Sequence, residues 1–210
     1  MSYLILVRHA ESTGNQQGIF QGQKDYPLSS NGLKQAEKLA EKLSRHAKLI
    51  VEPPELIVSS DLRRARATAE ALVRRWPVSF ELDPDLRERS GGSYEGLAKD
   101  IAIDAMTADL TKSQEVLKEH GYEFDQRVRE RALLALTHWS HISHQCPTIM
   151  VTHGHWLNVV FQALPIRNRD DLGAKLTNAG AWLLDWQAID LFDTRETPKS
   201  GPEIELIRLN

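Results

Sequence analysis

The sequence predicts a three-layer α/β/α sandwich with a largely parallel central sheet and a small cap insertion. Short apolar runs of strand length lie at residues 3–7, 56–60 and 148–152, and such runs are typical of parallel strands buried on both faces. Segments of helix length with an apolar stripe lie between them. Strands that alternate with helices in this way indicate a mostly parallel sheet with helices packed against it.

The first run, Tyr3–Val7, leads into a loop that glycine and proline punctuate up to residue 28. A helix is expected from about Ser30, because apolar residues then recur at helical spacing. These residues are Leu33, Ala36, Leu39, Ala40 and Leu43.

The second run, Leu56–Ser60, leads into a helix that is expected to reach Trp76. Asp61 is the expected N-cap of this helix, because its side chain can accept hydrogen bonds from the first backbone amides. A short strand at Val78–Leu82 is expected to follow.

The cap insertion is expected over about residues 97–124. Its core, Lys99–Glu119, is mixed in charge and weakly helical, so we expect it to lie over the sheet without joining the core. No repeat, low-complexity tract or linker divides the chain. Residues 1–210 are therefore expected to form a single domain that carries this insertion.

The rest of the chain returns to alternating elements. Asp125 is expected to cap a helix that runs to about Trp139. The elements expected after it are a buried strand at Thr148–Thr152, a helix at Trp156–Leu164, and strands at Ala181–Trp186 and Ile204–Leu209.

Composition narrows the class of protein. The chain has 210 residues, 41% hydrophobic and 26% charged, with a formal net charge of −3. This balance suits a globular domain and gives no electrostatic footprint for nucleic acid. No apolar stretch approaches the ~20 residues of a membrane-spanning helix. The single cysteine, Cys146, excludes an internal disulfide, so a reducing, cytoplasmic location is expected. The sequence does not determine the oligomeric state.

Polar side chains stand at the carboxyl ends of three expected strands: Arg8 and His9, then Arg63 and Arg64 just beyond the second strand, and His153. Ligands of open α/β sheets bind outside the carboxyl ends of the strands. Guanidinium groups bind phosphate oxygens through paired hydrogen bonds, and a neutral imidazole is a competent nucleophile. If the strands are neighbours, this combination predicts phosphoryl transfer through a phosphohistidine.

Four blocks in the chain resemble the histidine phosphatase (phosphoglycerate mutase-like) superfamily. They occur in the family's order between residue 4 and about residue 186, which is far more specific than a single Arg-His-Ala triplet. The blocks are Leu6-Val7-Arg8-His9-Ala10-Glu11-Ser12 with Asn15, Gln21-Gly22, Pro27-Leu28-Ser29 and Gly32; Ser60-Asp61-Leu62-Arg63-Arg64-Ala65 with Thr68-Ala69; Leu86-Arg87-Glu88-Arg89 with Glu95-Gly96; and Val151-Thr152-His153-Gly154.

The resemblance implies a catalytic role for five residues. His9 would be the nucleophile that becomes phosphorylated, and Arg8, Arg64 and His153 would hold the phosphoryl group and neutralise its charge. Glu88 would protonate the leaving oxygen and then activate water. Physical chemistry agrees, because a leaving alkoxide needs a proton and fixed positive charge lowers the barrier.

The resemblance also implies the substrate-binding residues. Asn15, Gln21 and Gly22 would lie at the pocket rim, and Gly154 would let the backbone approach closely. No metal or other cofactor is implied, because arginine and histidine supply the positive charge. The expected partner is a small-molecule phosphate ester; the sequence leaves open sugar phosphates, nucleotides, a cofactor-precursor phosphate and phosphoprotein.

The chain departs from the family pattern at several positions. Gly14 and Gly91 stand where aromatic residues are frequent, Gly180 where serine is common, and His155 where a second glycine is common. These departures predict an altered or more open substrate pocket and leave the five catalytic positions unchanged.

Spacing decides between rival residues within the blocks. Arg64 is favoured over Arg63 for the pocket, and Arg63 is expected to cap or to face solvent. Glu88 is favoured over Glu81 and Glu95, and Glu95 has a structural alternative in holding the turn at residues 92–96.

Other functions compete with hydrolysis. A cofactor-dependent phosphoglycerate-type mutase is the alternative within the family, but the short, charge-balanced insertion carries no basic cluster and favours a phosphatase. A non-catalytic phospho-ligand binding module is disfavoured, because His9 and Glu88 are both present.

A metal hydrolase is a third alternative. It would use a series of candidate ligands, namely His138, His141, His144 and Cys146. Steps of three drift by roughly 60° around a helix, and histidines late in a helix complement its negative end. A structural role is therefore favoured for the series.

Overall fold

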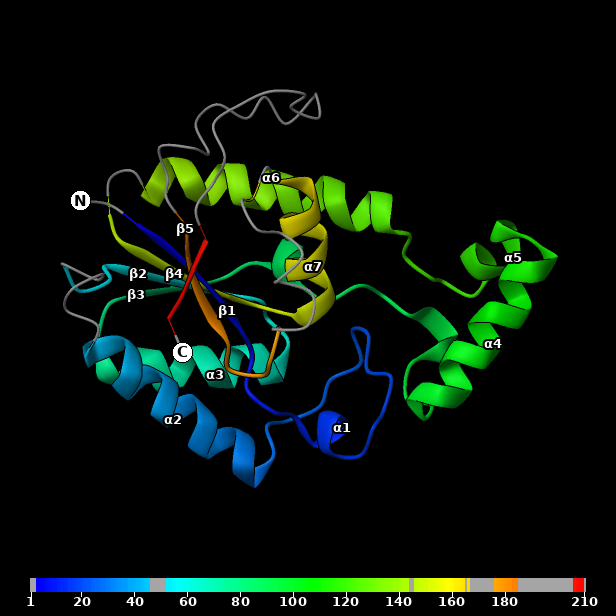
Figure 1. Cartoon of the computed structure of the whole chain (residues 1–210), viewed down its shortest axis with the longest axis horizontal. Coiled ribbons are helices and arrows are strands. Elements are labelled where there is room, and N and C mark those ends of the chain that lie inside the picture. Colours follow the sequence, from blue (N-terminus) through cyan, green and yellow to red (C-terminus); the bar gives the residue numbers. More distant parts are fainter. Residues whose placement is uncertain are drawn as a thin grey trace.

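The computed structural model describes residues 3–45, 52–143, 146–164, 166, 176–184 and 206–209. Within these residues a six-stranded sheet has the order β3-β2-β4-β1-β5-β6 (Figure 1). The strands are β1 Leu4–Arg8, β2 Leu56–Ser59, β3 Ser79–Leu82, β4 Thr148–Thr152, β5 Ala181–Leu184 and β6 Leu206–Arg208.

The four strands from β3 to β1 are parallel, β5 runs antiparallel to β1, and β6 runs antiparallel to β5. The register pairs Arg8 with Thr152 and Ser59 with Val151. The carboxyl ends of β1, β2 and β4 therefore meet at one edge of the sheet, which confirms the largely parallel sheet that the apolar runs predict.

Helices cover both faces of the sheet (Figure 1). One face carries α2 (Ser30–Arg45) and α3 (Arg63–Arg75), and the other carries α6 (Asp125–Ser143) and α7 (Gly154–Ala163). Successive strand residues point to opposite faces, so Leu4 and Leu6 pack with the α6–α7 core while Ile5 and Val7 pack with the α2–α3 core. This arrangement is the predicted three-layer sandwich.

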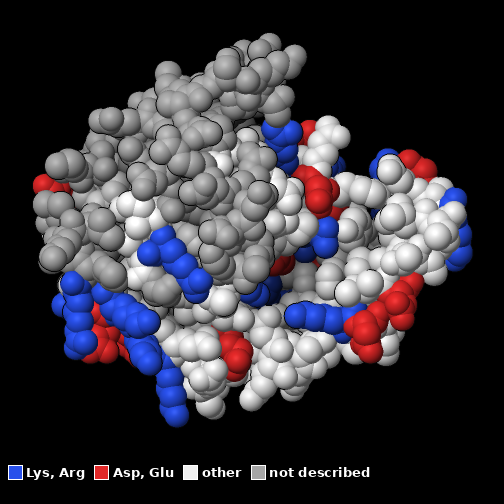
Figure 2. Space-filling model, in the orientation of Figure 1, with Lys and Arg blue, Asp and Glu red and all other residues white. Residues whose placement is uncertain are grey.

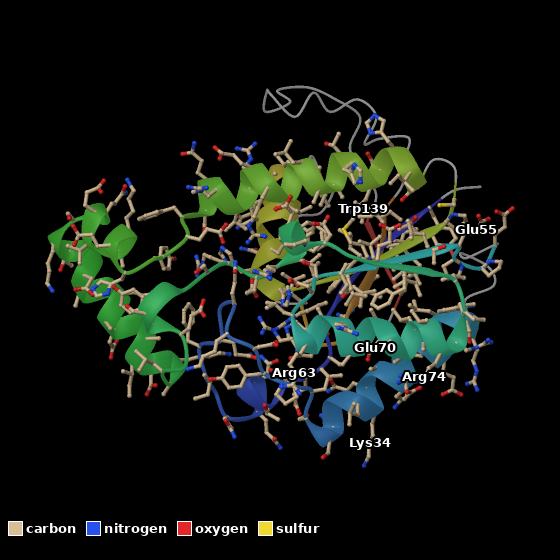
Figure 3. The ribbon with its side chains drawn as sticks, turned by 180° about the vertical axis from the view of Figure 1, so that it is seen from behind. Lys34, Glu55, Arg63, Glu70, Arg74 and Trp139 are labelled. Carbon is tan, nitrogen blue, oxygen red and sulfur yellow. The ribbon has the colours of Figure 1, made fainter. Side chains whose placement is uncertain are left out.

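Residue Trp139 shows how α6 is attached. Figure 3 shows it on the side of α6 that faces the sheet. Its indole Nε1 donates a 2.6 Å hydrogen bond to Asp83 Oδ2, next to the short 3-10 helix η1 (Pro84–Leu86). The residue thus ties α6 to the segment that leads to Glu88.

The insertion contains two helices, α4 (Lys99–Lys112) and α5 (Gln114–Glu119), after the 3-10 helix η2 (Gly92–Tyr94). Figure 1 shows this pair beside the carboxyl edge of the sheet rather than over a sheet face. A small apolar cluster of its own stabilises it, with Tyr94, Ala102 and Leu117 buried. The loop that holds α1 (Thr13–Gln16) lies next to it, and Phe20 packs against the cluster.

Two predicted N-caps are wrong. The N-cap of α3 is Leu62, whose side chain makes no capping hydrogen bond. The Asp61 carboxylate does not cap the helix because it binds the Arg87 guanidinium instead, with Arg87 Nε 2.6 Å from Asp61 Oδ1. Asp125 is the first residue of α6, and its carboxylate instead contacts Arg89 and His155.

One residue of the helical apolar repeat on α2 does not face the core. Leu33 is 53% exposed, because the inward position belongs to Gly32. A Cβ on Gly32 would lie 1.9 Å from the Glu11 backbone oxygen, so the helix approaches that loop through a glycine.

Several element ends differ from their predicted places, and some lie beyond the described residues. Helix α7 begins at Gly154, two residues before the expected start. The predicted strand ends at 185–186 and 204–205 and His144 lie outside the described residues. No helix in the part of the chain that the structure describes combines the length and apolarity needed to cross a membrane.

Candidate active site

A cavity of about 160 Å³ lies at the edge where the carboxyl ends of the parallel strands meet. Figure 2 shows the recess between the sheet body and the α4–α5 lobe, with Lys and Arg side chains around it. Seven of the nine residues that the sequence predicts for the site line it. These are Arg8, His9, Asn15, Gln21, Gly22, Arg64 and Glu88. The other two, His153 and Gly154, lie directly behind this lining.

His9 follows β1 and is only 2% exposed. Its backbone N–H donates to Thr152 O at 2.9 Å, so β4 fixes its position. The ring Nδ1 lies 2.7 Å from the Ala10 backbone oxygen, which can only accept a hydrogen bond. The proton therefore sits on Nδ1, and the lone pair is on Nε2.

Burial and charge keep His9 neutral. Burial lowers its pKa well below the ordinary 6.5, and the nearby guanidinium groups of Arg64 and Arg8 lower it further. A neutral imidazole with a free lone pair is the form that attacks phosphorus.

Arg64 extends from the first turn of α3 and is 1% exposed. Its Nη1 donates to Lys24 O at 3.0 Å and its Nη2 to Gly22 O at 2.6 Å. The loop after α1 therefore clamps the guanidinium from one side. Gly22 has a φ of +51°, a conformation that glycine adopts without strain.

Arg8 is held in a similar way at the end of β1. Its Nη1 donates to Leu176 O. A Cβ on Gly154 would lie 3.1 Å from Arg8 Nε, so a glycine at the start of α7 makes room for this guanidinium.

His153 follows β4 and is fully buried beside His9, with 5.0 Å between the ring centroids. Its Nε2 lies 2.9 Å from Ser60 Oγ at the end of β2. Burial lowers its pKa well below 6.5, and Arg64 and His9 lower it further. The three parallel strand ends are thus joined through side chains.

Three buried nitrogens around His9 have no hydrogen-bond partner among the described residues: Arg8 Nε, Arg64 Nε and His153 Nδ1. Buried polar groups are nearly always hydrogen-bonded, so unpaired ones need an explanation. N–H donors near a nucleophile suit a tetrahedral oxyanion, whose oxygens accept several hydrogen bonds.

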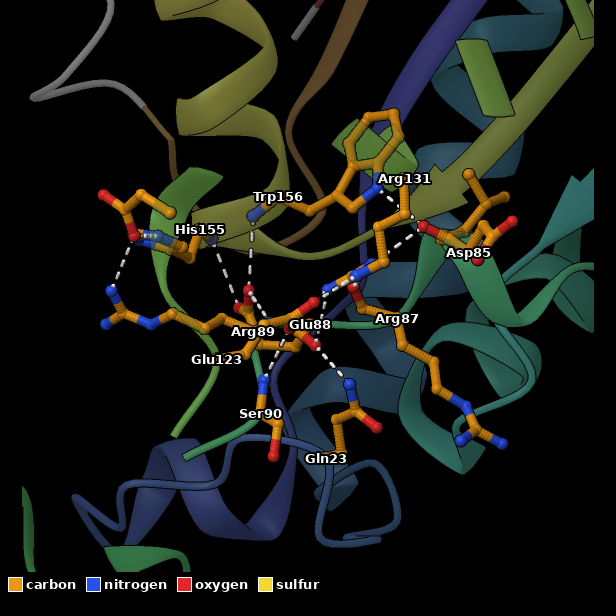
Figure 4. A network of polar contacts seen from close by, with 12 residues as sticks. Gln23, Asp85, Arg87, Glu88, Arg89, Ser90, Glu123, Arg131, His155 and Trp156 are labelled. Carbon is orange, nitrogen blue, oxygen red and sulfur yellow. Dashed lines mark hydrogen bonds and ion pairs between the residues drawn. The ribbon is translucent and has the colours of Figure 1, made fainter. Parts of the chain in front are cut away.

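Glu88 also lines the cavity, and its carboxylate contacts the first residues of α7 (Figure 4). Its Oε1 accepts from Arg89 N at 3.1 Å and Trp156 N at 3.2 Å, and its Oε2 accepts from His155 N at 3.2 Å. The N-cap of α7, His153, offers no side-chain bond to these amides. Glu88 therefore caps α7 from another part of the chain.

Sequence reasoning missed this capping role. Its only signal is a negative one, because no Ser, Thr, Asp or Asn immediately precedes α7. A helix that starts without a local cap needs an acceptor from elsewhere.

Asn15 and Gln21 are organised by Ser12, which is fully buried. Asn15 Oδ1 accepts from Ser12 N at 3.1 Å and from Asn178 Nδ2 at 3.3 Å. Gln21 Oε1 accepts from Ser12 Oγ at 2.6 Å. Both amides are therefore oriented at the pocket wall.

Neighbouring side chains occupy the space next to Gly14 and Gly91, the two glycines that stand where aromatic residues are frequent. A Cβ on Gly14 would meet the Gln21 side chain at 2.6 Å, and one on Gly91 would meet Phe20 Cε1 at 2.3 Å. Phe20 also lines the cavity. Side chains from the α1 loop therefore occupy the space next to both glycines.

Three cationic or titratable rim residues were not predicted as site residues: Arg89, Lys99 and His155. Asp125 joins two of them, since its Oδ1 lies 3.0 Å from Arg89 Nη1 and 2.8 Å from His155 Nε2. The available signals were the place of Arg89 beside Glu88 and the unusual histidine after Gly154.

The rejected residues lie elsewhere. Arg63 is exposed, and its backbone N–H donates to Asp25 at 2.8 Å. Glu81 is exposed on β3. Glu95 Oε1 accepts from Gln23 N and Gly91 N, each at 2.8 Å, so Glu95 holds the turn.

The histidine series on α6 forms no metal site within the described residues. His141 Nδ1 lies 2.7 Å from Thr137 O, and the ring of His138 packs edge-on against Trp139. These contacts are local to the helix.

Comparison with known proteins gives a consistent result. The family model of the histidine phosphatase superfamily (branch 1) matches residues 4–188. A metal-independent phosphoserine phosphatase of Arabidopsis thaliana is 32% identical over 197 residues, covering 87% of this chain and 79% of that protein. A glucosyl-3-phosphoglycerate phosphatase of Mycobacterium tuberculosis is 34% identical over 183 residues, covering 81% and 79%.

Solved structures agree with these relatives. The structure of a mycobacterial glucosyl-3-phosphoglycerate phosphatase in complex with VO3 superposes with a TM-score of 0.71. The identity is 27%, and the match covers 99% of this chain and 97% of the other.

The two buried histidines predict a pH dependence of stability. Their folded pKa values lie below 6.5, so below about pH 6.5 the unfolded chain binds protons that the folded chain does not. The free energy of unfolding should therefore fall as pH drops, by up to about 1.4 kcal/mol per pH unit for each histidine. Urea unfolding between about pH 7.5 and 5.5 measures this slope.

The matched variants are His153→Gln and His138→Gln. The first removes a buried base and should flatten the slope, whereas the second replaces an exposed histidine and should keep it. Equal slopes in the two variants would contradict the burial argument.

Proposed function

The chain belongs to branch 1 of the histidine phosphatase superfamily, and we propose that it hydrolyses small phosphate esters through a phosphohistidine on His9. The observation that carries the proposal is the neutral His9 imidazole among three unpaired buried donors. Arginine and histidine supply the positive charge that a metal ion provides in other phosphatases.

In the first step His9 Nε2 attacks phosphorus, and the bond between phosphorus and the ester oxygen breaks. A proton from Glu88 goes to the leaving oxygen, so that an alcohol departs. Arg8, Arg64 and His153 bind the oxygens of the transferring group and stabilise their charge without moving.

In the second step water attacks phosphorus, and the bond to His9 Nε2 breaks. Glu88, now a carboxylate, takes the proton from water. Inorganic phosphate leaves, and His9 returns to its neutral form. One carboxyl group thus serves as acid and then as base.

Hydrolysis is favoured over the two related functions. The two relatives named above are phosphatases, at 32% and 34% identity over more than 80% of the chain, whereas a phosphoglycerate mutase-like protein of Arabidopsis thaliana is 29% identical over 76% of it. A non-catalytic binding module would not need both His9 and Glu88 at the same cavity. At the rim, Arg89 and Lys99 add positive charge that complements a phosphate dianion.

The nucleophile is tested by hydrolysis of p-nitrophenyl phosphate in the presence of a chelator. Wild-type protein should turn over, and His9→Ala should lose activity about 1000-fold or more, because the nucleophile of the first step is removed. His138→Ala is the control, since it replaces an exposed histidine away from the cavity. Full activity in His9→Ala would refute the mechanism, and loss of wild-type activity with chelator would favour a metal-dependent reaction.

The acid is tested by changing the leaving group. Glu88→Gln keeps an accepting oxygen for the α7 amides but has no proton to give. The value of kcat/KM reports transfer to His9 and not the later attack of water. For an alkyl phosphate it should fall by about 10²- to 10⁴-fold, and for p-nitrophenyl phosphate much less, because nitrophenolate leaves without protonation. Equal slowing of both esters would argue against Glu88 as the acid.

A further inference from the structure

Arg131 lies on α6, outside the cavity lining, yet it contacts the backbone that carries Glu88 (Figure 4). Its side chain is 17% exposed. Nη1 donates to Asp85 O at 2.8 Å and to Arg87 O at 2.7 Å, and Nη2 donates to Glu88 O at 3.1 Å. One guanidinium thus donates hydrogen bonds to three backbone carbonyls within residues 85–88.

The remaining donors of Arg131 bind a carboxylate. Nε donates to Glu123 Oε1 at 2.7 Å, and Nη2 donates to Glu123 Oε2 at 2.9 Å. A guanidinium has five N–H donors in a fixed fork, and these contacts use all five. Lysine, with three donors on a flexible stem, cannot reproduce the pattern.

Glu123 extends the same support to the other side of Glu88. Its Oε2 accepts from Ser90 N at 3.0 Å, and its backbone N–H donates to Ser90 O at 2.9 Å. Burial raises the pKa of Glu123, but bonds from Arg131 and Ser90 N outweigh that effect and leave it lowered. The pair is therefore ionised at neutral pH.

The segment between η1 and η2 has no regular secondary structure to fix it. Besides the Arg131 bond, the Glu88 carbonyl accepts from Gln23 Nε2 at 3.0 Å. The bonds from its carboxylate to α7 are 3.2 Å long. Side-chain contacts therefore determine where the Glu88 carboxyl group stands.

We propose that Arg131, held by Glu123, is a positioning residue that sets the place of the Glu88 carboxyl group relative to the leaving oxygen. The inference rests on the proposed acid–base role of Glu88. Within the described residues Arg131 hydrogen-bonds no lining group except through this backbone. Its positive charge also acts on His153, and lysine keeps that charge, so the effect of Arg131→Lys should fall on the proton-transfer step. A displacement of about 1 Å in a catalytic group can cost about 100-fold in rate.

The test compares Arg131→Lys and Glu123→Gln with the wild-type protein, using an alkyl phosphate, p-nitrophenyl phosphate and inorganic phosphate as a competitive inhibitor. Arg131→Lys should lower kcat/KM, which reports transfer to His9, by about 10- to 100-fold for the alkyl phosphate and by about threefold or less for p-nitrophenyl phosphate. Inhibition by phosphate should not change, because the groups that bind it stay in place. Glu123→Gln should show the same selective loss for the alkyl phosphate, but a smaller one. This variant provides the test if Arg131→Lys folds poorly.

Arg87→Met is the matched control. It removes another bidentate pair, between Arg87 and Asp61, next to Glu88 in sequence. Within the described residues that arginine side chain holds no carbonyl of the segment, so the ratio of the two ester rates should stay at the wild-type value.

The outcomes separate the inference from the function on which it rests. Equal slowing of both esters in Arg131→Lys would show a merely structural role, and unchanged rates would show none; either result overturns the inference. If Glu88→Gln shows no selective loss, the acid assignment itself fails, and the positioning role fails with it.

Discussion

The burial of two guanidinium groups beside a neutral histidine is the constraint on which the rest of the site depends. Burial lowers the pKa of Arg8 and Arg64, while the negative charge of Glu88 raises both. Backbone carbonyls from the α1 loop and from residue 176 hold the guanidinium groups. Buried charge is costly unless it is paired and hydrogen-bonded. The carbonyl acceptors of these loops therefore stabilise the two buried guanidinium groups.

Glu88 joins the chemistry to the stability of the fold. The same carboxyl group lines the cavity and caps α7, whose first residue, Gly154, lies against Arg8. The exposed backbone amides of the helix N-terminus bind this carboxyl group, so the fold holds it in place for both steps. Glu88 stands in a short irregular loop. The Arg131 guanidinium, with all its donors bonded, connects this loop to α6 and so supports both roles of Glu88.

Much of this could be predicted from the sequence, because local signals exist for it. Apolar runs gave the strands, and parallel pairing then required Arg8, His9 and His153 to meet. The errors share a cause: Asp61 and Asp125 have good capping side chains, but distant arginine and histidine partners compete for them. The role of Arg131 leaves no sequence signal, since its carbonyl partners lie more than 40 residues away.

The central claim is that phosphate passes through His9. It is tested most directly by mixing the protein with a phosphate ester, quenching in alkali, where phosphohistidine survives, and mapping the modified peptide by mass spectrometry. The account predicts phosphate on His9 in the wild-type protein, and more of it in Glu88→Gln with p-nitrophenyl phosphate, where water attack is slowed. Turnover with no phosphate on His9 in either protein, or with phosphate on another residue, would contradict it.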